Sequence, residues 1–392
     1  MLPSKVVASL FRDPILPGAT IGIIGGGQLG RMMAIAAKAM GYRIAVLDPN
    51  PDSPCGQLAD FKVIASYSSL EAMKQLAEVS DVVTYEFENI DEDALEAAGK
   101  FSWVPQGTKV LEIAKDRIKE KQAITKAGLP VAPYKPVSTI EHLAEAVAHL
   151  GYPCVVKTAR GGYDGKGQRV VRDEKSMIAA AELLHHGPCV VEQWLTFEKE
   201  ISVIVTRSTS GETAVFPVAE NIHYNNILHE TIVPARISKR TEASAIALAI
   251  KLADSLKMIG TLAVEMFLLE DGSISINEVA PRPHNSGHYS IEACETSQFE
   301  QHIRAVCNLP LSRTNLLKPA VMVNILGEHQ KDLLSKISEL KDWNVHLYGK
   351  TEAKPGRKMG HATLLRNTID EALDEIEKTG IWHAKETAAA GK

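Results

Sequence analysis

The sequence predicts a multidomain protein of the α/β and α+β classes, and three observations lead to this prediction. The chain has 392 residues, more than a single hydrophobic core usually organises. Residues 20–48 read as strand, helix and strand, which indicates a β-α-β unit. Further along, apolar runs flank glycine-containing turns at residues 161–167 and 271–272, which indicates antiparallel hairpins.

The composition indicates which kinds of molecule the protein binds. Hydrophobic residues make up 45% and charged residues 23%, the net charge is -5, and no apolar run approaches the roughly 20 residues of a membrane span. We therefore expect small-molecule substrates, no nucleic acid and no membrane. An odd number of cysteines without a C-x-x-C pair predicts reduced, packed thiols and a cytoplasmic protein. These are Cys55, Cys154, Cys189, Cys294 and Cys307.

The first domain is expected to begin at residue 20, after an N-terminal arm of residues 1–19 that is too broken for a secretion signal. Gly25, Gly27 and Gly30 fit G-x-G-x-x-G at the turn from strand to helix, and Asp48 ends the second strand. This pattern is typical of dinucleotide binding, so an NAD-dependent dehydrogenase is one alternative. The other is that the glycines only permit a tight turn, and no later segment supplies a hydride-transfer site.

The alternation continues through residues 61–90. FKVIA reads as a strand, SSLEAMKQLAEV as a helix, and DVVTYEFENI as a strand that delivers Tyr85, Glu86 and Glu88 to its carboxyl end. Open parallel sheets bind ligands at that end. One long charged helix is then expected before the break GLPVAP, with a new domain from about residue 118.

The segment GGYDGKG, residues 161–167, has four glycines in seven positions. It is not a Walker loop, because Arg160 replaces the first glycine, Gly167 replaces the hydroxyl residue, and QRVVRD beyond it reads as a strand. We expect a flexible lid whose backbone N–H groups cover phosphate oxygens, with Lys157 adding a positive charge. The alternative is a plain hairpin loop with Lys157 on the surface.

The turn Asp271-Gly272 predicts a tight hairpin in which Glu265 faces Glu278 directly. Two buried carboxylates at facing positions require a proton or a cation between them, and oxygen ligands beside a polyphosphate favour Mg²⁺. The alternative is a slipped register with one glutamate in water. Alternation predicts that both glutamates lie on the core-facing side, together with Phe267, Leu269, Ile274 and Ile276.

Lys157, the glycine-rich lid, the segment EQW at residues 192–194, Glu200 and the paired glutamates together resemble the ATP-grasp superfamily. The resemblance implies two α+β lobes that hold ATP, with Mg²⁺ on Glu265 and Glu278. The ATP-binding residues that it implies are Arg117, Lys157, Gly162, Tyr163, Asp164, Gly165, Lys166, Gly167, Gln168, Glu192, Gln193, Trp194, Leu195, Glu200, His223, Asn277 and Glu278.

Within that superfamily the chain is similar to the N5-carboxyaminoimidazole ribonucleotide synthetases of bacterial purine biosynthesis. The similarity is carried, in this order, by GGGQLGRM, YEFENI, GGYDGKGQ, NEVAPRPHNSGH and YGK with PGRKMGH. It implies three domains in the chain: a Rossmann-like domain at residues 20–117, an ATP-grasp domain at 118–307 and a small β-rich domain at 318–380. It also implies that the protein is a homodimer. The ATP-grasp domain divides into a lid-bearing lobe at 118–195 and a metal-bearing lobe at 196–307.

The reaction implied by this similarity is attack of bicarbonate on the γ-phosphate of ATP, followed by carboxylation of the exocyclic amine of aminoimidazole ribonucleotide. The implied catalytic residues are Glu86, Tyr163, Asp164, Arg282, His284 and Asn285. The implied substrate-binding residues are Gln28, Leu29, Tyr85, Glu86, Lys350, Arg357 and Lys358.

Four other activities stay open at this stage. A formate-dependent glycinamide ribonucleotide transformylase also carries ATP-grasp lobes, although NSGH and YEFENI favour the carboxylating enzyme. A biotin-dependent carboxylase lobe would use the same co-substrates, but the chain is short for that family and contains no biotin-carrier segment. The NAD-dependent dehydrogenase and a nucleotide sensor without turnover are the remaining two.

Overall fold

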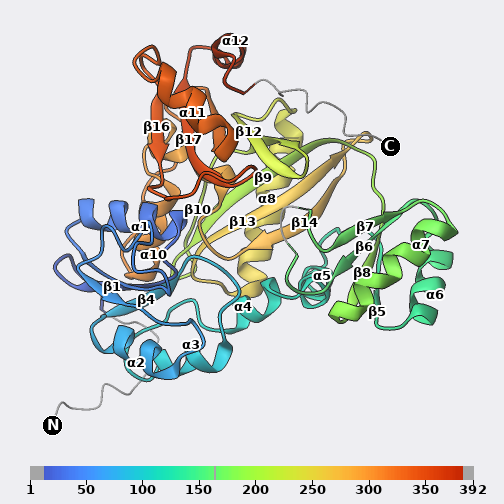
Figure 1. The fold of residues 1–392 in the computed structure, drawn as a ribbon, viewed down its shortest axis with the longest axis horizontal. Helices are drawn as coiled ribbons and strands as arrows, with labels where there is room; N and C mark the ends of the chain where they lie inside the picture. The colour runs from blue at the N-terminus through green and yellow to red at the C-terminus, as the bar shows by residue number, and fades with distance from the viewer. Residues whose placement is uncertain (1–12, 163–164, 383–392) are drawn as a thin grey trace.

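The computed structural model describes residues 13–162 and 165–382, which form three parts around one large sheet (Figure 1). The N-terminal arm lies within the described residues only from residue 13 onward. There it contacts both the N-terminal part and the end of a later helix, since Tyr42 Oη donates to Ile15 O at 2.6 Å and Ile15 N donates to Cys307 O at 2.8 Å. The arm is therefore fixed against the body of the protein at its inner end.

The N-terminal part contains the predicted β-α-β unit within a four-stranded parallel sheet of order β3-β2-β1-β4. The side chains of β1 belong to two apolar clusters, one on each face of the sheet: Ile21 and Ile23 lie in one cluster and Ile24 lies in the other. Helices therefore cover both faces of this sheet. Its elements are β1 (Thr20–Ile24), α1 (Gln28–Ala39), β2 (Arg43–Leu47), β3 (Phe61–Val63), α2 (Leu70–Glu78), β4 (Val82–Tyr85) and α3 (Glu92–Ala98).

The charged segment after this part forms two helices, and the prediction of one long helix is wrong. They are α4 (Lys109–Ala114) and α5 (Arg117–Lys126). Asp116 separates them because its carboxylate accepts hydrogen bonds from Ile118 N at 3.1 Å and Lys119 N at 3.3 Å, which is the role of an N-cap. The break turns α5 toward the centre of the molecule.

The lid-bearing lobe is an antiparallel sheet of order β5-β8-β6-β7 with helices on one side (Figure 1). The predicted hairpin around GGYDGKG is confirmed, since β6 and β7 are its two strands, with Val155 opposite Val170. The elements are β5 (Tyr134–Val137), α6 (Ile140–Leu150), β6 (Cys154–Thr158), β7 (Gln168–Val171), α7 (Glu174–Ala180), η1 (Ala181–His186) and β8 (Cys189–Gln193).

The large sheet has the order β14-β13-β9-β11-β12-β15-β17-β16, with β10 paired to β9. Its first six strands in the chain are β9 (Phe197–Arg207), β10 (Thr213–Val215), β11 (Ala219–Tyr224), β12 (Ile227–Val233), β13 (Gly260–Leu269) and β14 (Ile274–Ala280). The strands of the C-terminal segment are β15 (Ala320–Leu326), β16 (Asn344–Leu347) and β17 (Lys358–Leu365). They extend the same sheet through the pairing of β12 with β15, which the sequence does not predict.

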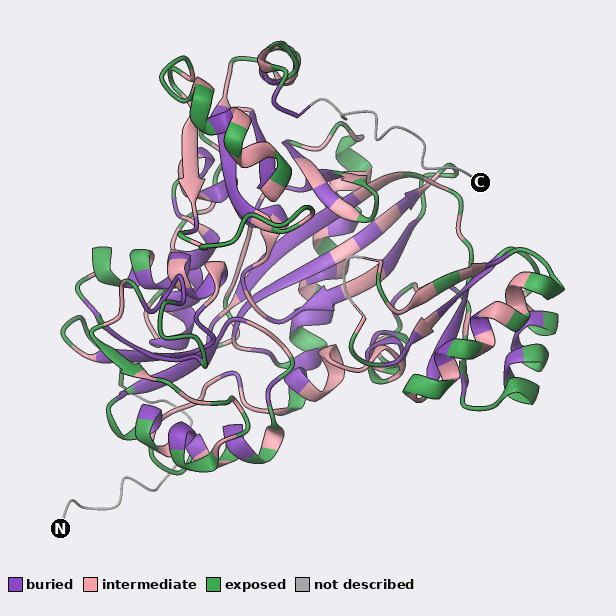
Figure 2. Cartoon of the chain, viewed as in Figure 1, coloured by how far each residue is buried: buried purple, intermediate pink, exposed green. Residues whose placement is uncertain are grey.

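Helices cover both faces of this sheet. Val203 and Val205 pack with Leu252 of α8, whereas Ile204 packs with Tyr289 and Ala293 on the opposite face. The strands are buried along most of their length and the outward sides of the helices are exposed (Figure 2). These helices are α8 (Lys239–Leu256), η2 (Asn285–Gly287), α9 (Ser290–Ala293), α10 (Gln298–Val306), α11 (Gly327–Lys336) and α12 (Ile369–Thr379).

The hairpin of β13 and β14 confirms the pairing of Glu265 with Glu278 but not the register near the turn. Leu268 lies opposite Ile274, because the turn contains three residues and closes with Leu269 N donating to Ser273 O at 2.9 Å. The register shifts by one residue between Glu265 and Met266, which restores the predicted glutamate pair.

The predicted face of the glutamates is wrong. Val264 and Met266 pack against α8 in the core together with Ile276, whereas Glu265 and Phe267 line the opposite, cleft-facing side. The bulge places Ile276 opposite Met266, so the isoleucines of β14 do not share the side of Glu265. The two carboxylates therefore face a cavity and not the hydrophobic core.

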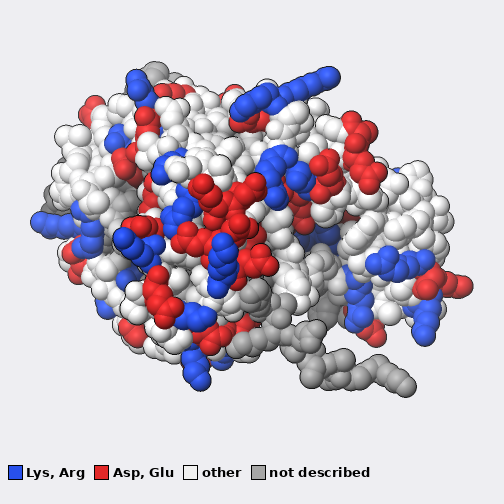
Figure 3. Space-filling model, turned by 90° about the horizontal axis from the view of Figure 1, so that it is seen from above, with Lys and Arg blue, Asp and Glu red and all other residues white. Residues whose placement is uncertain are grey.

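On the face drawn in Figure 3, Lys and Arg are interspersed with Asp and Glu. No helix within residues 13–162 and 165–382 is long and apolar enough to cross a membrane. All five cysteines are buried and free, as predicted.

Candidate active site

A cleft of about 550 Å³ lies between the lid-bearing lobe and the large sheet. It brings together residues that lie up to 270 positions apart, from Glu88 to Lys358. The predicted site residues that line it are Arg117, Lys157, Gly162, Gly165, Gln168, Glu192, Gln193, Trp194, Leu195, Glu200, His223, Glu265, Asn277, Glu278, Arg282, His284, Asn285 and Lys358. Lys166 and Gly167 lie beside it in the lid, and Tyr163 and Asp164 lie outside the described residues.

The lid enters this cleft with backbone that only glycine adopts readily. Gly161, Gly165 and Gly167 have φ values of +79°, +79° and +71°, in the left-handed region. The carbonyl of Gly162 accepts a hydrogen bond from Arg117 Nη2 at 3.1 Å. The glycines are therefore required by the path of the loop, and Arg117 connects that path to the opposite wall.

One buried lysine joins the two walls, and the sequence does not predict it. Lys121 Nζ lies 3.2 Å from Glu192 Oε2 on β8 and donates to Asn277 O on β14 at 2.8 Å. Lys157 Nζ contacts the same glutamate oxygen at 3.3 Å. Although burial opposes its charge, Lys157 and Lys121 hold the pKa of Glu192 below its ordinary value. Burial lowers the pKa of Lys157 itself.

Glu120 on the same helix is a second buried residue that the sequence analysis misses. Its side chain is 2% exposed and its Oε1 accepts a hydrogen bond from Val279 N at 2.7 Å. Burial raises the pKa of Glu120 to about 8. A stripe of charged residues gives no apolar pattern, so no sequence signal distinguishes the buried face of α5 from a solvated one.

The two facing glutamates differ in their environments. Arg117 Nη1 lies 3.1 Å from Glu278 Oε2, and the side chain of Glu278 is 43% exposed to the cleft against 16% for Glu265. Burial, and then the charge of Glu278, raises the pKa of Glu265 to about 8. Although burial opposes it, Arg117 lowers the pKa of Glu278. The described residues thus place one protonated and one ionised carboxyl group side by side.

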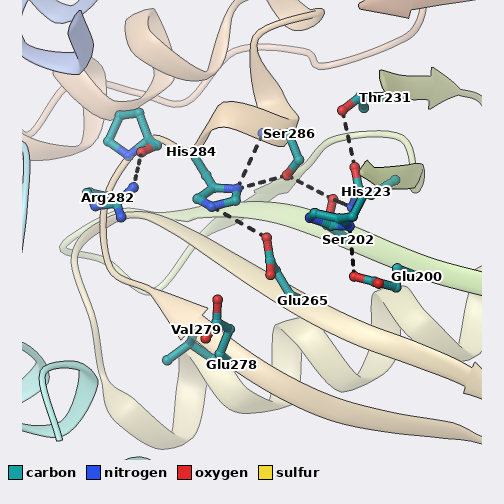
Figure 4. A network of polar contacts seen from close by, with 12 residues as sticks. Glu200, Ser202, His223, Thr231, Glu265, Glu278, Val279, Arg282, His284 and Ser286 are labelled. Carbon is teal, nitrogen blue, oxygen red and sulfur yellow. Dashed lines mark hydrogen bonds and ion pairs between the residues drawn. The ribbon is translucent and has the colours of Figure 1, made fainter. Parts of the chain in front are cut away.

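Histidines complete the sheet side of the cleft (Figure 4). His223 Nδ1 lies 2.9 Å from Glu200 Oε2, and although burial opposes its charge, that hydrogen bond raises the pKa of His223. His284 Nε2 lies 3.4 Å from Glu265 Oε1. Burial, followed by the charges of Arg282 and Lys358, holds the pKa of His284 well below its ordinary value, so it is neutral near pH 7.

An aromatic pair and an unsatisfied amide distinguish the two ends of the cleft. Phe197 and Phe267 stack with ring centroids 4.4 Å apart and line the end near β8, which suits a planar base. At the other end, both amide atoms of Asn285 are buried without a hydrogen-bond partner among the described residues. Arg282 lies there too, with Nε 2.7 Å from Glu88 Oε1. Sequence reasoning misses the aromatic pair because its members are 70 residues apart.

The first glycine turn is closed by the protein's own carboxylates. Glu86 Oε2 accepts a hydrogen bond from Gly30 N at 2.7 Å, and Glu86 Oε1 accepts one from Gly27 N. Asp48 Oδ2 accepts from Gly26 N at 2.6 Å. In this structure these groups fill the place of a dinucleotide pyrophosphate, which argues against the dehydrogenase alternative. Burial raises the pKa of Glu86, although the two N–H groups oppose that shift.

The remaining predicted substrate residues lie away from the cleft. The Tyr85 side chain is fully buried in an apolar cluster, and its hydroxyl has no hydrogen-bond partner among the described residues, so its contact with a ligand stays a prediction. Leu29 is 8% exposed and packs in the core beside Gln28, the first residue of α1. The segment with Lys350 and Arg357 contacts the N-terminal part, since Gln57 Nε2 donates to Gly349 O at 3.1 Å.

Lys350 is the residue of that segment whose charge interacts with Glu86 of the first glycine turn. Its Nζ donates to Lys358 O at 2.7 Å, and Lys358 lines the cleft. Burial lowers the pKa of Lys350 to about 8, while the charge of Glu86 opposes that shift. Arg357 is exposed and donates from Nη1 to Glu352 O at 2.9 Å. A polar region thus extends from the cleft to the start of α1.

Comparison with known proteins identifies the family. An N5-carboxyaminoimidazole ribonucleotide synthase of Bacillus subtilis is 56% identical over 373 residues, which cover 95% of this chain and 98% of that protein. The chain belongs to the N5-carboxyaminoimidazole ribonucleotide synthase family. Three domain families match within it: the ribonucleotide synthetase preATP-grasp domain at residues 18–115, the ATP-grasp domain at 122–299 and the phosphoribosylaminoimidazole carboxylase C-terminal domain at 320–375.

Solved structures of the family share the whole fold. A synthetase in complex with ADP has a TM-score of 0.92 and 61% identity, covering 94% of this chain and 98% of that one. The Aspergillus clavatus enzyme in complex with ADP and 5-aminoimidazole ribonucleotide has a TM-score of 0.86 and 34% identity, covering 92% and 97%. The predicted α/β and α+β class with an ATP-grasp core is confirmed.

Proposed function

We propose that this protein is an ATP-dependent carbon–nitrogen ligase that carboxylates the exocyclic amine of 5-aminoimidazole ribonucleotide in purine biosynthesis. ATP and bicarbonate are consumed, and N5-carboxyaminoimidazole ribonucleotide, ADP and phosphate are formed. The observation that carries this proposal is a single cleft in which a glycine lid and Lys157 face the pair Glu265 and Glu278. Its support comes from relatives in complex with ADP and with aminoimidazole ribonucleotide.

ATP would lie along the cleft with its base at the β8 end. The stacked ring pair and apolar neighbours such as Val155 and Leu195 can cover a purine, while backbone groups of residues 192–195 can pair with its edge. Lys157, Arg117 and the N–H groups of the lid then face the phosphates, which attract positive charge and backbone donors.

The glutamate pair fits magnesium. Facing carboxylates on adjacent strands offer the oxygen ligands that Mg²⁺ prefers, and without a cation one of them keeps a proton. No group of three His, Cys, Asp or Glu side chains that could hold a metal occurs among the described residues, so nucleotide oxygens and water would complete the shell. Bound there, the ion would offset charge that develops during phosphoryl transfer.

The chemistry begins when a bicarbonate oxygen attacks the γ-phosphorus, releasing ADP and leaving carboxyphosphate. The amine nitrogen attacks the carbon of carboxyphosphate, or of CO2 released from it, so that phosphate departs and the amine loses a proton. Arg282, His284 and the unsatisfied amide of Asn285 stand at the end of the cleft where bicarbonate must approach. Enclosure under the lid keeps water from the short-lived intermediate.

The nucleotide substrate would bind between the cleft and the first glycine turn. Lys350, Arg357 and Lys358 supply positive charge for its 5′-phosphate, and Gln28 lies at the start of α1. Glu86 lies close enough to this region for its charge to raise the pKa of Lys350 and for the charge of Arg282 to lower the pKa of Glu86. Its carboxylate can hold or deprotonate the amine once a ligand replaces its bonds to the glycine turn. Tyr163 and Asp164 of the lid complete the proposed set.

We further propose a cytoplasmic homodimer. The five reduced cysteines fit that compartment. A partner surface is available on the N-terminal part, where the exposed large apolar side chains are Ile35, Phe61, Ile64, Leu70, Val79 and Phe101. Light scattering tests the assembly: we expect a mass near twice 42.6 kDa, and a mass of one chain at micromolar concentration contradicts it.

Formation of ADP tests the proposed function. The full chain is incubated with ATP, Mg²⁺, bicarbonate and aminoimidazole ribonucleotide, and each component is omitted in turn. We expect fast release of ADP only in the complete mixture, with the carbamate trapped as product. Equal rates with formate in place of bicarbonate would identify a formate-dependent ligase. Binding of ATP without any turnover would identify a nucleotide sensor.

A further inference from the structure

A line of side-chain hydrogen bonds runs through the large sheet to His284, which lies 3.4 Å from Glu265 in the cleft (Figure 4). It starts on β12, crosses β11 and β9, passes through η2 and ends at Glu265 on β13. We call it the polar relay, and its members are Thr231, Asn221, Ser202, Ser286, His284 and Glu265.

The inner half of the polar relay is inaccessible to water. Thr231 Oγ1 donates to Asn221 Oδ1 at 3.2 Å, and Asn221 Nδ2 donates to Ser202 Oγ at 2.9 Å. Ser202 Oγ then donates to Ser286 Oγ at 2.9 Å. The most exposed of these four residues, Asn221, is only 4% exposed. Each hydroxyl therefore has one acceptor for its proton, and the bonds all run in the direction of the cleft.

The outer half fixes the tautomer of His284. Ser286 N lies 3.3 Å from His284 Nδ1, and a backbone N–H can only donate. Ser286 Oγ, which already accepts the Ser202 proton, lies 3.0 Å from the same nitrogen and donates its own proton there. Nδ1 is thus an acceptor twice over, and the ring proton of the neutral imidazole is on Nε2. That nitrogen lies 3.4 Å from Glu265 Oε1.

Packing alone does not account for these polar side chains. Ile204, two residues beyond Ser202 on the same face of β9, belongs to an apolar cluster with Ala219, Ala263 and Tyr289. Apolar residues would fill the place of the serine and asparagine at no net cost, because a buried hydrogen-bonded network is rarely more stable than a well-packed apolar one. The polarity at these positions indicates a role in the site.

We propose that the polar relay holds His284 as a neutral hydrogen-bond donor, with its Nε2 proton directed at Glu265 and the reacting end of the cleft. Asn221, Ser202 and Ser286 are then positioning residues that act through His284. The Nε2 proton is then available for a hydrogen bond in the cleft, and Nε2 does not accept a proton. The consequence for catalysis rests on the proposed function, whereas the tautomer does not.

The tautomer is measured directly by ¹⁵N NMR of the full chain labelled at histidine. We expect the wild-type His284 signal, assigned by its loss in His284→Gln, to show a protonated Nε2 and an unprotonated Nδ1. In Ser202→Ala we expect the Nδ1–H tautomer to become populated, because Ser286 Oγ can then accept from Nδ1 and only the longer bond from Ser286 N, of 3.3 Å, still favours the Nε2–H form. A wild-type Nδ1–H tautomer, or an unchanged spectrum in Ser202→Ala, would overturn the proposal.

Kinetics test the positioning role with a matched control on the same strand. Loss of an outer partner of a site residue costs about tenfold or more, so we expect Ser202→Ala to lower kcat about tenfold. KM for ATP should stay within about twofold of the wild-type value, because the polar relay does not contact the end of the cleft that holds the adenine base. Ser202→Thr keeps the hydroxyl and should restore kcat. The control is Thr206→Val. It removes a buried hydrogen bond of 2.9 Å between the hydroxyls of Thr206 and Thr261, which lies away from the cleft, and it should leave kcat unchanged.

Equal losses of kcat in Ser202→Ala and Thr206→Val, or a shifted tautomer with unchanged kcat, would overturn the positioning role. If Ser202→Ala does not fold, Asn221→Asp takes its place, since a carboxylate cannot donate to Ser202. If the wild-type chain does not carboxylate aminoimidazole ribonucleotide, the proposed function fails, and the NMR spectrum still decides the tautomer.

Discussion

Two glycine-rich turns in this protein match phosphate-binding patterns, and the structure treats them in opposite ways. The turn at residues 25–30 is closed, because Glu86 and Asp48 accept the N–H bonds that a phosphate would take. The loop at residues 161–167 borders a 550 Å³ cleft, and its Gly162 carbonyl accepts a hydrogen bond from Arg117 on the opposite wall. Glycine spacing indicates a close approach of backbone to some group, but not which group.

The difference assigns separate tasks to the two turns. The second turn borders the cleft with Lys157 and the glutamate pair, where a triphosphate finds positive charge. The first turn presents a carboxylate whose hydrogen bonds to the glycines must be given up before it can serve a substrate. Changes near the second turn should therefore act mainly on turnover, whereas loss of Glu86 at the first turn should lower stability in addition to turnover.

The largest expected effect comes from Glu278→Gln. It removes the ionised member of the glutamate pair, so turnover should fall by more than about a hundredfold while the fold is retained. Initial rates of ADP formation and circular dichroism measure the two quantities. Glu182→Gln, an exposed change in the lid-bearing lobe, is the control and should leave turnover unchanged. Retained turnover in Glu278→Gln would remove this residue from the metal site.

The next effect tests the closed turn. In wild type the Glu86 carboxylate accepts hydrogen bonds from two backbone N–H groups. In Glu86→Gln one of these N–H groups faces the amide NH2, which cannot accept, so the free energy of unfolding should fall by about 1–3 kcal/mol. Urea unfolding measures it, with the exposed change Glu96→Gln expected within about 0.5 kcal/mol of wild type. Equal stability of both variants would show that the carboxylate does not hold the turn.

A glycine of the open loop gives a smaller effect. Gly167 has φ of +71°, and an added Cβ would lie 2.6 Å from Thr158 Oγ1, so Gly167→Ala should cost about 1–2 kcal/mol. If the strain opposes closure of the lid, turnover falls roughly tenfold. Gly107→Ala is the matched control, because it has φ of +61° with open space around it and lies outside the loop. Equal turnover in both variants would argue against a moving lid.

The last prediction concerns the pH dependence of stability, which the buried carboxyl beside the cleft controls. Glu120 has a pKa of about 8 in the folded state against 4.5 ordinarily, so the folded protein holds an extra proton between these values. Its contribution to stability is therefore lost as pH rises from 4.5 to 8, by at most about 1.4 kcal/mol per pH unit. The free energy of unfolding of Glu120→Gln should fall less steeply from pH 5 to 8. Parallel pH profiles would contradict this.

Local patterns carry much of this organisation. The β-α-β unit follows from the periodicity of residues 20–48, and the hairpin strands follow from the turns at residues 161–167 and 271–272. The pairing of Glu265 with Glu278 is also correct, although the predicted two-residue turn is not. The three-residue turn shifts the register by one and the bulge near Met266 shifts it back, so two deviations cancel at the glutamates.

Tertiary contacts explain what the sequence does not predict. Lys121 and Glu120 lie on a helix with no apolar stripe, and only the docking of α5 between two lobes buries them. The cleft-facing side of Glu265 depends on α8 covering the other face of β13. The closing of the first glycine turn depends on a carboxylate 56 residues away from Gly30, which no local pattern specifies.

The most direct test of the account is a crystal structure with a non-hydrolysable ATP analogue and Mg²⁺. We expect the base near Phe197, the phosphates between Lys157 and the lid, and one metal ion within about 2.1 Å of oxygens from both Glu265 and Glu278. Glu86 should still hold the turn at residues 25–30. A nucleotide bound at that turn, with the space between Glu265 and Lys157 empty, would contradict the assignment of the two glycine turns.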